Sequence, residues 1–375
     1  MTDGSRWRWR GNVALLGVAL AFVLYPLLPI DDVINSDWPA FATGARLIVN
    51  DPAHLYDFDA QRRVELQVTG GRTLVTLGIH GFLPFLAPAW VALLAVPFAA
   101  LGTDAGGRLW IVFGLLCLIG GLYLATRPRP PTALLPAFAS VPTALLMLNA
   151  QLDGVVALGI GGALALWSQP WWSGFVLGLT LVKPQLVLPV GFGLLVARRW
   201  KTLAGWAACG VMQLAATLAV NPHWVMQWLA QAGSTVQVGA REVNLAHFAV
   251  YLPASTETAG IVVLTLIAIC GAVALAWRRY RRDKELGPAA AILVIGGVLA
   301  SPHALPADLV LVALGLAIWD RAGWLEWLAL SVAALAAAVV PAPAPAAIGA
   351  LLIGWLTLRI SAERRELSAS PVTAR

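Results

Sequence analysis

Long apolar runs, separated by short polar connections, constrain this chain more than any other feature of its sequence. Charged residues make up 12% of the chain and hydrophobic residues 59%, whereas a soluble globular protein carries about 25% charged residues. Such a chain cannot cover one core with a water-facing surface, so it needs lipid as solvent. Because a span takes about 20 mainly apolar residues, the 375 residues can supply about a dozen. The sequence predicts one all-α, polytopic membrane domain over residues 1–375, with about 12 transmembrane helices.

Basic residues lie mainly between the apolar runs, where they act as orientation signals and do not indicate a nucleic-acid partner. Three arginines precede the first run, for which we predict a retained span over about residues 13–30. The run RRYRRDK after residue 277 and the tail over about 360–375 are also basic. The positive-inside rule therefore predicts a multi-pass protein of the cell (plasma) membrane with both termini in the cytoplasm.

Two polar stretches are too long to be simple turns. We predict an external loop over about residues 31–80 and a second over about 221–257, both on the same face of the membrane. Apolar residues in the first loop recur at helical spacing over 38–49, and a polar helical pattern follows over 59–68. These patterns predict short interfacial helices within the loop.

The remaining apolar runs complete the predicted topology, with one exception to the positive-inside rule. Arg127 and Arg129 fall on the external side, unlike most basic residues. A re-entrant segment within 132–167 is the alternative that would explain them. The predicted spans after the first loop cover residues 82–101, 109–126, 132–148, 152–167, 174–197, 203–220, 258–277, 289–300, 305–319, 324–340 and 346–358.

Asp37 is the candidate catalytic residue of the first external loop. A carboxylate just beyond a membrane helix lies at headgroup depth and can take a proton from an attacking hydroxyl as general base. The competing interpretation is a helix N-cap, because Ser36 and Asp37 directly precede a helical pattern with Pro39 in its first turn. The sequence leaves both interpretations open.

Lys183 lies inside an apolar run, LTLVKPQLVLP, where an ionisable residue is costly and indicates a functional site. Pro184 and Pro189 distort a helix there and free backbone carbonyls. We predict that Lys183 binds a phosphate that enters from the bilayer. A snorkelling or internally paired lysine is the alternative.

Polar residues also interrupt the run MLNAQLDGVV, which contains Asn149, Gln151 and Asp153. They either line a cavity, where Gln151 contacts a sugar, or join helices by hydrogen bonds. His303 and Asp308 lie at an external helix start in ASPHALPADLVLV and are candidate contacts for a headgroup or sugar. An ordinary turn and helix entry would also explain them.

The second external loop contributes Arg241 and Asn244, on either side of Glu242 and Val243. Arg241 is a candidate phosphate clamp, although a solvated loop charge fits equally well. The histidines show no metal-ligand spacing, and the three cysteines lie within apolar runs, so we predict no metal site. No G-x-x-x-x-G-K-[ST] motif occurs, and no cofactor is indicated.

Taken together, these stretches resemble glycosyltransferase family 87, also known as the DUF2029 group of the GT-C superfamily. The matching stretches occur in the family's order and are spread over most of the chain. They are SDWPAFATGARLIVNDPAHLYD, FLPFLAPAWVALLAVPFAALG, LNAQLDGVVALGIGGALAL, GFVLGLTLVKPQLVLPVGFGLLVARRWK, REVNLAHF and SPHALPADLVLV.

The resemblance implies a GT-C-like fold and an inverting transfer of a sugar, mannose-like or another hexose or pentose, outside the cytoplasmic membrane. The donor would be a polyprenyl-phosphate sugar and the acceptor a lipid-linked or glycan hydroxyl of the cell envelope. Asp37 matches the family's acidic position after the first helix, Lys183 its Lys-Pro element and His303 its Ser-Pro-His element. The resemblance thus implies that Asp37 is the general base.

Two other functions fit a polytopic chain with a buried lysine. A transporter or flippase of a polyprenyl-linked or lipid substrate also needs broken helices and a polar pathway, but the sequence shows no repeat. A non-catalytic subunit of an envelope-glycan assembly is the second, and it predicts tolerance to substitution of Asp37.

Overall fold

The computed structural model describes residues 33–363, apart from 73, 77–78 and 233–240. The predicted first span over 13–30 and most of the predicted tail over 360–375 lie outside these residues. Apart from turns and irregular connections, the described chain is helical and contains one antiparallel hairpin, β1 (Leu74–Thr76) and β2 (Ile79–Gly81), which the sequence did not predict. The α-helices are α3 (Trp38–Asn50), α4 (Phe58–Val68), α5 (Ala89–Ala99), α6 (Thr103–Thr126), α7 (Leu135–Phe138), α8 (Val141–Leu148), α9 (Asp153–Ala165), α10 (Pro170–Leu177), α11 (Leu188–Val196), α12 (Trp200–Leu218), α13 (Trp224–Ala232), α14 (Ala254–Asp283), α15 (Leu286–Ala300), α16 (Val310–Trp319), α17 (Trp324–Val339) and α18 (Ala344–Ala362).

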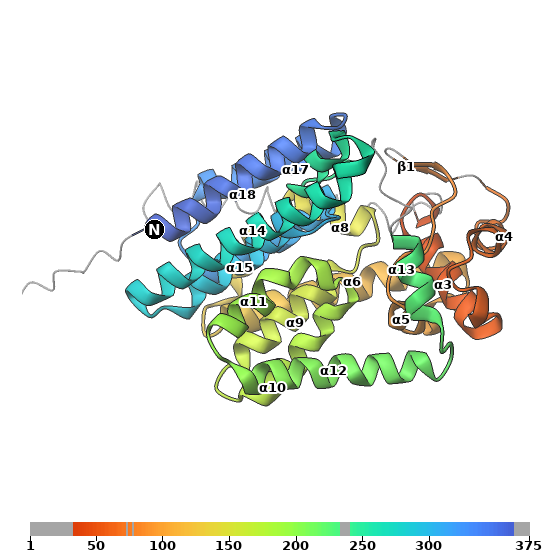
Figure 1. Ribbon diagram of the computed structural model, residues 1–375, viewed down its shortest axis with the longest axis horizontal. Coiled ribbons are helices and arrows are strands. Elements are labelled where there is room, and N and C mark those ends of the chain that lie inside the picture. Colours follow the sequence, from red (N-terminus) through yellow and green to blue (C-terminus); the bar gives the residue numbers. More distant parts are fainter. Residues whose placement is uncertain (1–32, 73, 77–78, 233–240, 364–375) are drawn as a thin grey trace, which may run out of the picture.

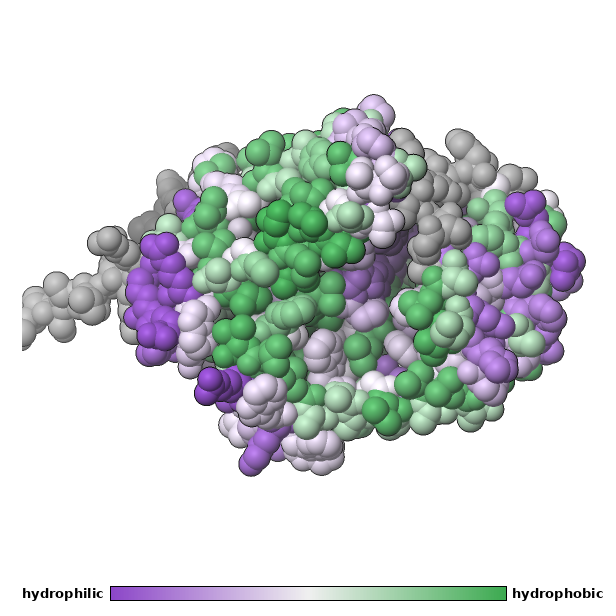
Figure 2. Space-filling view, viewed as in Figure 1, coloured by the Kyte–Doolittle hydropathy of each residue, from purple (hydrophilic) through white to green (hydrophobic). Residues whose placement is uncertain are grey.

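The longer helices run along the long axis of the molecule (Figure 1), and Figure 2 shows hydrophilic residues gathered at both ends of this axis with a hydrophobic band between them. A band of this kind is the surface that a bilayer requires. Among the residues that the structure describes, three helices, α6, α14 and α18, are each long and apolar enough to cross a membrane. The chain is therefore an all-helical integral membrane protein in its architecture, while the count of 12 spans stays a prediction.

The two ends of the long axis differ in the segments that they contain. We call the end with α3, α4 and α13 the loop end, because both predicted external loops lie there. These loops contact each other, since Asn221 donates from Nδ2 to the carbonyl of Pro52 (2.6 Å). We call the opposite end, which holds Arg129, Arg199 and Arg321, the basic end.

The path of the chain between the ends differs from the predicted topology at residues 82–101. Only Ala89–Ala99 of this range is helical, and α5 packs against α3 within the loop end instead of forming a full span. Helix α6 then starts at the loop end, where Trp38 donates from Nε1 to the carbonyl of Thr103 (2.8 Å). Apolar composition alone does not distinguish a helix that faces lipid from one covered by a loop.

Because α6 starts at the loop end, its C-terminus reaches the basic end. Arg129 donates there to the Ala317 carbonyl (2.7 Å) and pairs with Asp320 (2.6 Å), just after α16. The prediction that Arg127 and Arg129 lie on the side of the external loops is therefore wrong. The intervening helices α7 and α8 have only 4 and 8 residues, so the predicted span over 132–148 is broken.

The predicted span over 174–197 is a helical hairpin with its turn at Lys183. Helix α10 and a 3-10 segment (Gly178–Val182) lead to the turn, and a second 3-10 segment (Pro184–Val187) and α11 lead away. Proline at residue 184 has no backbone N–H and disfavours helical geometry in the residue before it. Lys183 accordingly has φ −139° and ψ 70°, outside the helical region.

Helices α6 and α9 pack in parallel and in unusually close contact. An added Cβ at Gly154 would lie 2.0 Å from the carbonyl oxygen of Gly114, and one at Gly161 would lie 2.0 Å from that of Gly121. Glycine at these positions lets the two backbones touch. These contacts fix the position of the N-terminus of α9 along α6. The break between α8 and α9 directly precedes this N-terminus.

Candidate functional site

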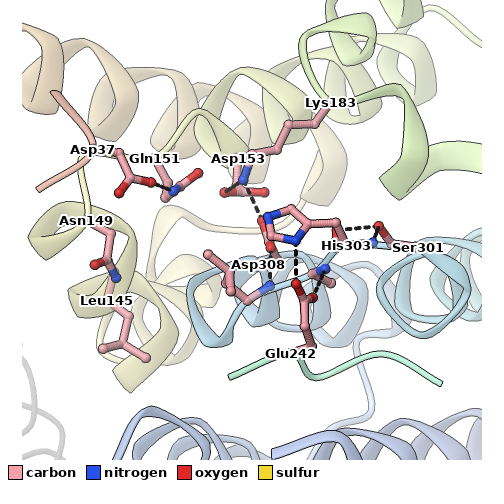
Figure 3. Close-up of polar contacts among 12 residues, drawn as sticks. Asp37, Leu145, Asn149, Gln151, Asp153, Lys183, Glu242, Ser301, His303 and Asp308 are labelled. Atoms are coloured by element: carbon pink, nitrogen blue, oxygen red, sulfur yellow. Dashed lines mark hydrogen bonds and ion pairs between the residues drawn. The ribbon is translucent and has the colours of Figure 1, made fainter. Parts of the chain in front are cut away.

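Near the loop end, Figure 2 shows a hollow with hydrophilic residues at its floor. Polar side chains from five separate segments converge in the same part of the molecule (Figure 3). The segments are the start of α3, the break between α8 and α9, the hairpin turn, the second loop and the turn before α16. Four of the segments are helix ends or breaks, where backbone groups are free and the chain can change direction, and the second loop is an irregular segment.

Asp37 stands at the N-cap of α3, but its side chain makes no cap hydrogen bond. The carboxylate instead accepts a hydrogen bond from the side-chain amide of Gln151. The backbone N–H of Asp37 donates to the Asn149 carbonyl (3.2 Å), which ties the start of α3 to the break between α8 and α9. The structure therefore lacks the side-chain N-cap that was one of the two interpretations of Asp37. The carboxylate is directed at the cluster instead.

Lys183 lies between two carboxylates. Its ammonium donates to Asp153 Oδ2 (2.9 Å), at the start of α9, and to Asp308 Oδ1 (2.6 Å), before α16. Asp308 also accepts from the backbone N–H of Leu305 (2.5 Å), so its position is fixed by the turn. The lysine side chain is 16% exposed and keeps one of its three N–H donors for another partner. Lys183 is thus internally paired through two of its three N–H donors.

His303 joins the second loop to the turn before α16. Its Nδ1 contacts the carboxylate of Glu242, which also accepts from the backbone N–H of Ala304 (2.7 Å) and from Asn244 Nδ2 (2.7 Å). Ser301 Oγ accepts from the backbone N–H of His303 (3.2 Å). The imidazole itself is 62% exposed and faces the open side of the cluster.

The surroundings of Asp37 and His303 raise the pKa of both groups, and the two groups still carry opposite charges at neutral pH. Burial raises the pKa of Asp37 to about 6, against the opposing attraction of Lys183. The carboxylate of Glu242 raises the pKa of His303 to about 9, although the nearby Lys183 opposes this rise. At pH 7, Asp37 is mainly ionised and His303 mainly cationic, so the cluster presents a base and a cationic donor together.

The structure brings together five of the seven predicted site residues: Asp37, Gln151, Lys183, His303 and Asp308. The other two, Arg241 and Asn244, have hydrogen-bond partners outside this group of five. Arg241 donates to the carbonyl of Ala338 at the end of α17 (2.7 Å), and Asn244 is buried beneath Glu242.

Two residues of the cluster were missing from the predicted set. Asp153 and Glu242 lie close in sequence to predicted site residues. Nothing in their local sequence indicates their partners, Lys183 and His303, which lie 30 and 61 positions away. Among the described residues, no group of three or more His, Cys, Asp or Glu side chains has the arrangement of a metal site.

The chain matches one known family. A family model described as glycosyltransferase family 87 matches residues 85–302, which is more than half of the chain. The matched region includes Gln151, Asp153, Lys183 and Glu242, while Asp37 precedes it and His303 directly follows it. No curated protein and no solved structure matches the chain.

Proposed function

The chain belongs to glycosyltransferase family 87 and is a membrane glycosyltransferase, and we propose that it transfers a sugar from a polyprenyl-phosphate donor to a hydroxyl of a lipid-linked or glycan acceptor. One observation supports this reaction most strongly. A carboxylate that is not used as a helix cap shares one cluster with the imidazole of His303, whose pKa is raised by Glu242. Base catalysis and stabilisation of a phosphate leaving group need these two groups.

The proposed reaction begins with Asp37 as the general base. Asp37 takes the proton of the acceptor hydroxyl while the acceptor oxygen forms a bond to the anomeric carbon. The bond from that carbon to the phosphate oxygen breaks, and its electron pair leaves with the polyprenyl phosphate. Attack and departure occur on opposite faces, so the configuration inverts. One base suffices, whereas glycoside hydrolysis usually uses two carboxylates.

The leaving phosphate carries the negative charge that develops in this step, so donors preorganised around it lower the barrier. His303 supplies a cationic donor on the open side of the cluster. Lys183 supplies its remaining N–H, while Asp153 and Asp308 hold the ammonium in place. Arg241 is the weaker candidate, because its guanidinium already donates to the end of α17.

We also propose that the cluster opens to the outside of the cell membrane, with the basic end in the cytoplasm. Arg127, Arg129, Arg198 and Arg199 lie in turns at the basic end, and Lys201 lies in the first turn of α12 there, as the positive-inside rule requires of cytoplasmic loops and helix ends. A donor lipid whose tail lies between the helices would bring its phosphate to the hairpin turn at Lys183.

The test is transfer by the purified full-length protein in lipid nanodiscs. It receives polyprenyl-phosphate mannose and, in parallel, donors with other hexoses and pentoses, each labelled in the sugar, together with membrane lipid extract as acceptor. A labelled lipid product formed by the native protein but not by Asp37→Asn supports the proposal. Movement of intact labelled donor across liposomes, with no sugar transfer from any donor, would instead identify a transporter.

A further inference from the structure

The backbone segment that carries Glu242 is closely packed on two sides. Residues 241–245 pass between the turn before α16 and helix α18. On one side, Val243 donates from its backbone to the Ala304 carbonyl (2.8 Å). On the other side, an added Cβ at Gly349 would lie 2.0 Å from the Val243 carbonyl oxygen. The segment is therefore held from both sides, and the direction of the Glu242 side chain is fixed with it.

The Glu242 carboxylate has three donors and little solvent around it. Its side chain is 8% exposed, and it is contacted by His303 Nδ1, the Ala304 backbone N–H and Asn244 Nδ2. With Nδ1 engaged, Nε2 is the nitrogen left for a ligand. Figure 3 shows the ring standing between Glu242 and the side of the cluster that holds Asp153 and Lys183.

We propose that Glu242 is a positioning residue that fixes the ring of His303 and keeps it cationic, so that the Nε2–H donor faces the phosphate of the departing polyprenyl phosphate. This role rests on the proposed function, because it requires a phosphate at the cluster. Glu242 itself touches neither substrate nor the reacting atoms, and it acts only through His303.

The charged groups around His303 support this role. Glu242 and Asp308 favour the imidazolium, whereas Lys183 disfavours it. Glu242 is the largest of these influences, and with it the pKa of His303 is about 9. A neutral glutamine at 242 can still accept from Ala304 and donate to Nδ1, which preserves the ring position. Without the negative charge, the pKa of His303 falls near or below its ordinary value of about 6.5.

The experiment compares binding of a polyprenyl monophosphate, the expected reaction product, to the native protein, Glu242→Gln and His303→Ala from pH 5.5 to 8.5 in nanodiscs. Glu257→Gln is the matched control, because Glu257 lies on the same loop, in the first turn of α14, and does not act on His303. Ionisation of the phosphate itself affects all proteins equally, so the differences between them report on the protein.

At pH 8 we expect Glu242→Gln to bind about tenfold more weakly than the native protein, because only a few per cent of a histidine with a pKa near 6.5 is cationic there. At pH 5.5, where more of His303 in Glu242→Gln is cationic, the difference between the two proteins should be smaller, and His303→Ala should bind weakly at both pH values. A Glu242→Gln protein that loses thermal stability but keeps the native pH profile would reduce Glu242 to a structural residue. Failure of every protein, including the native one, to bind the monophosphate would overturn the proposed donor class as well.

Discussion

The carboxylate of Asp37 accepts a hydrogen bond from the side chain of Gln151, although Asp37 occupies the N-cap of α3. Ser36 takes over part of the capping role, since its Oγ accepts from the backbone N–H of Trp38 (3.2 Å). Pro39 follows in the first turn and has no N–H to satisfy. The helix can therefore begin without the Asp37 side chain, which leaves the carboxylate available for chemistry.

Replacing Asp37 with asparagine should abolish most transfer and leave the fold intact. Loss of a general base costs about 10²- to 10⁴-fold in rate, while no cap hydrogen bond is lost. Initial rates and the thermal unfolding midpoint of the purified variant measure the two effects. Transfer within a few-fold of the native rate would remove Asp37 as the base.

Asp57→Ala is the matched control for this variant. Asp57 is the N-cap of α4 in the same loop, and its Oδ1 does accept from the backbone N–H of Ala60 (2.7 Å). Its loss should lower the free energy of unfolding by about 1 kcal/mol and leave the turnover of the folded protein unchanged.

The rate should fall as pH is lowered through about 6. Asp37 accepts a proton only when ionised, and its raised pKa of about 6 places that change close to neutrality. Gln151→Leu removes a hydrogen bond that favours the ionised form, so it should move this acid limb to higher pH. Profiles of kcat/KM from pH 4.5 to 7.5 test both statements, and an acid limb at the same pH in both proteins would contradict the assignment.

Lys183→Ala should destabilise the protein as well as weaken donor use. It leaves Asp153 and Asp308 buried without their cation, and breaking a buried pair costs about 3–5 kcal/mol. Adding Asp308→Asn to Lys183→Ala should restore part of that loss, which thermal unfolding in detergent would measure. Lys201→Ala, at the exposed start of α12, should change neither property.

The close packing of α6 and α9 predicts a contrast between two glycines. Gly161→Ala forces a Cβ against the Gly121 backbone and should lower the free energy of unfolding by about 1–3 kcal/mol. Gly271→Ala, inside α14, meets no atom within 4 Å and should be neutral or slightly stabilising because alanine favours helix. Equal unfolding midpoints would show that α6 and α9 are not in contact as described.

Cysteine labelling in intact cells tests the corrected path of the chain. In a variant without Cys117, Cys209 and Cys270, Arg127→Cys and Lys201→Cys should both resist a membrane-impermeant maleimide until the cells are permeabilised. Asp59→Cys, at the loop end, should react in intact cells. Labelling of Arg127→Cys together with Asp59→Cys would restore the topology predicted from sequence.

Local patterns predicted the helical elements well because helix formation depends mainly on nearby residues. The helices predicted over 38–49 and 59–68 are α3 and α4 within one residue at either end. Lys183 was identified as a site residue because a charge in an apolar run has few explanations. Its proline neighbour also indicated the break that the structure contains.

Long-range relations could not be predicted in the same way. Apolar side chains of α5 pack against α3 within the protein. A helix covered by protein and a helix covered by lipid have the same hydropathy. A full span over 82–101 was therefore predicted where the structure has only the short helix α5. That span reversed the predicted direction of α6 and placed Arg129 on the wrong side. The pairing of Glu242 with His303 likewise depends on tertiary packing between segments 61 positions apart.

The position of Lys183 between two carboxylates also bears on how the chain enters the membrane. Asp153 precedes Lys183 by 30 positions, and Asp308 follows it by 125. During synthesis, a counter-ion is already present when the lysine emerges from the ribosome, so the charge need not enter the bilayer alone. The second carboxylate arrives only when most of the protein has been made, and its docking closes the cluster. A chain that ends before Asp308 can therefore hold Lys183 and Asp153 as a neutral pair, but it lacks the second carboxylate of the cluster.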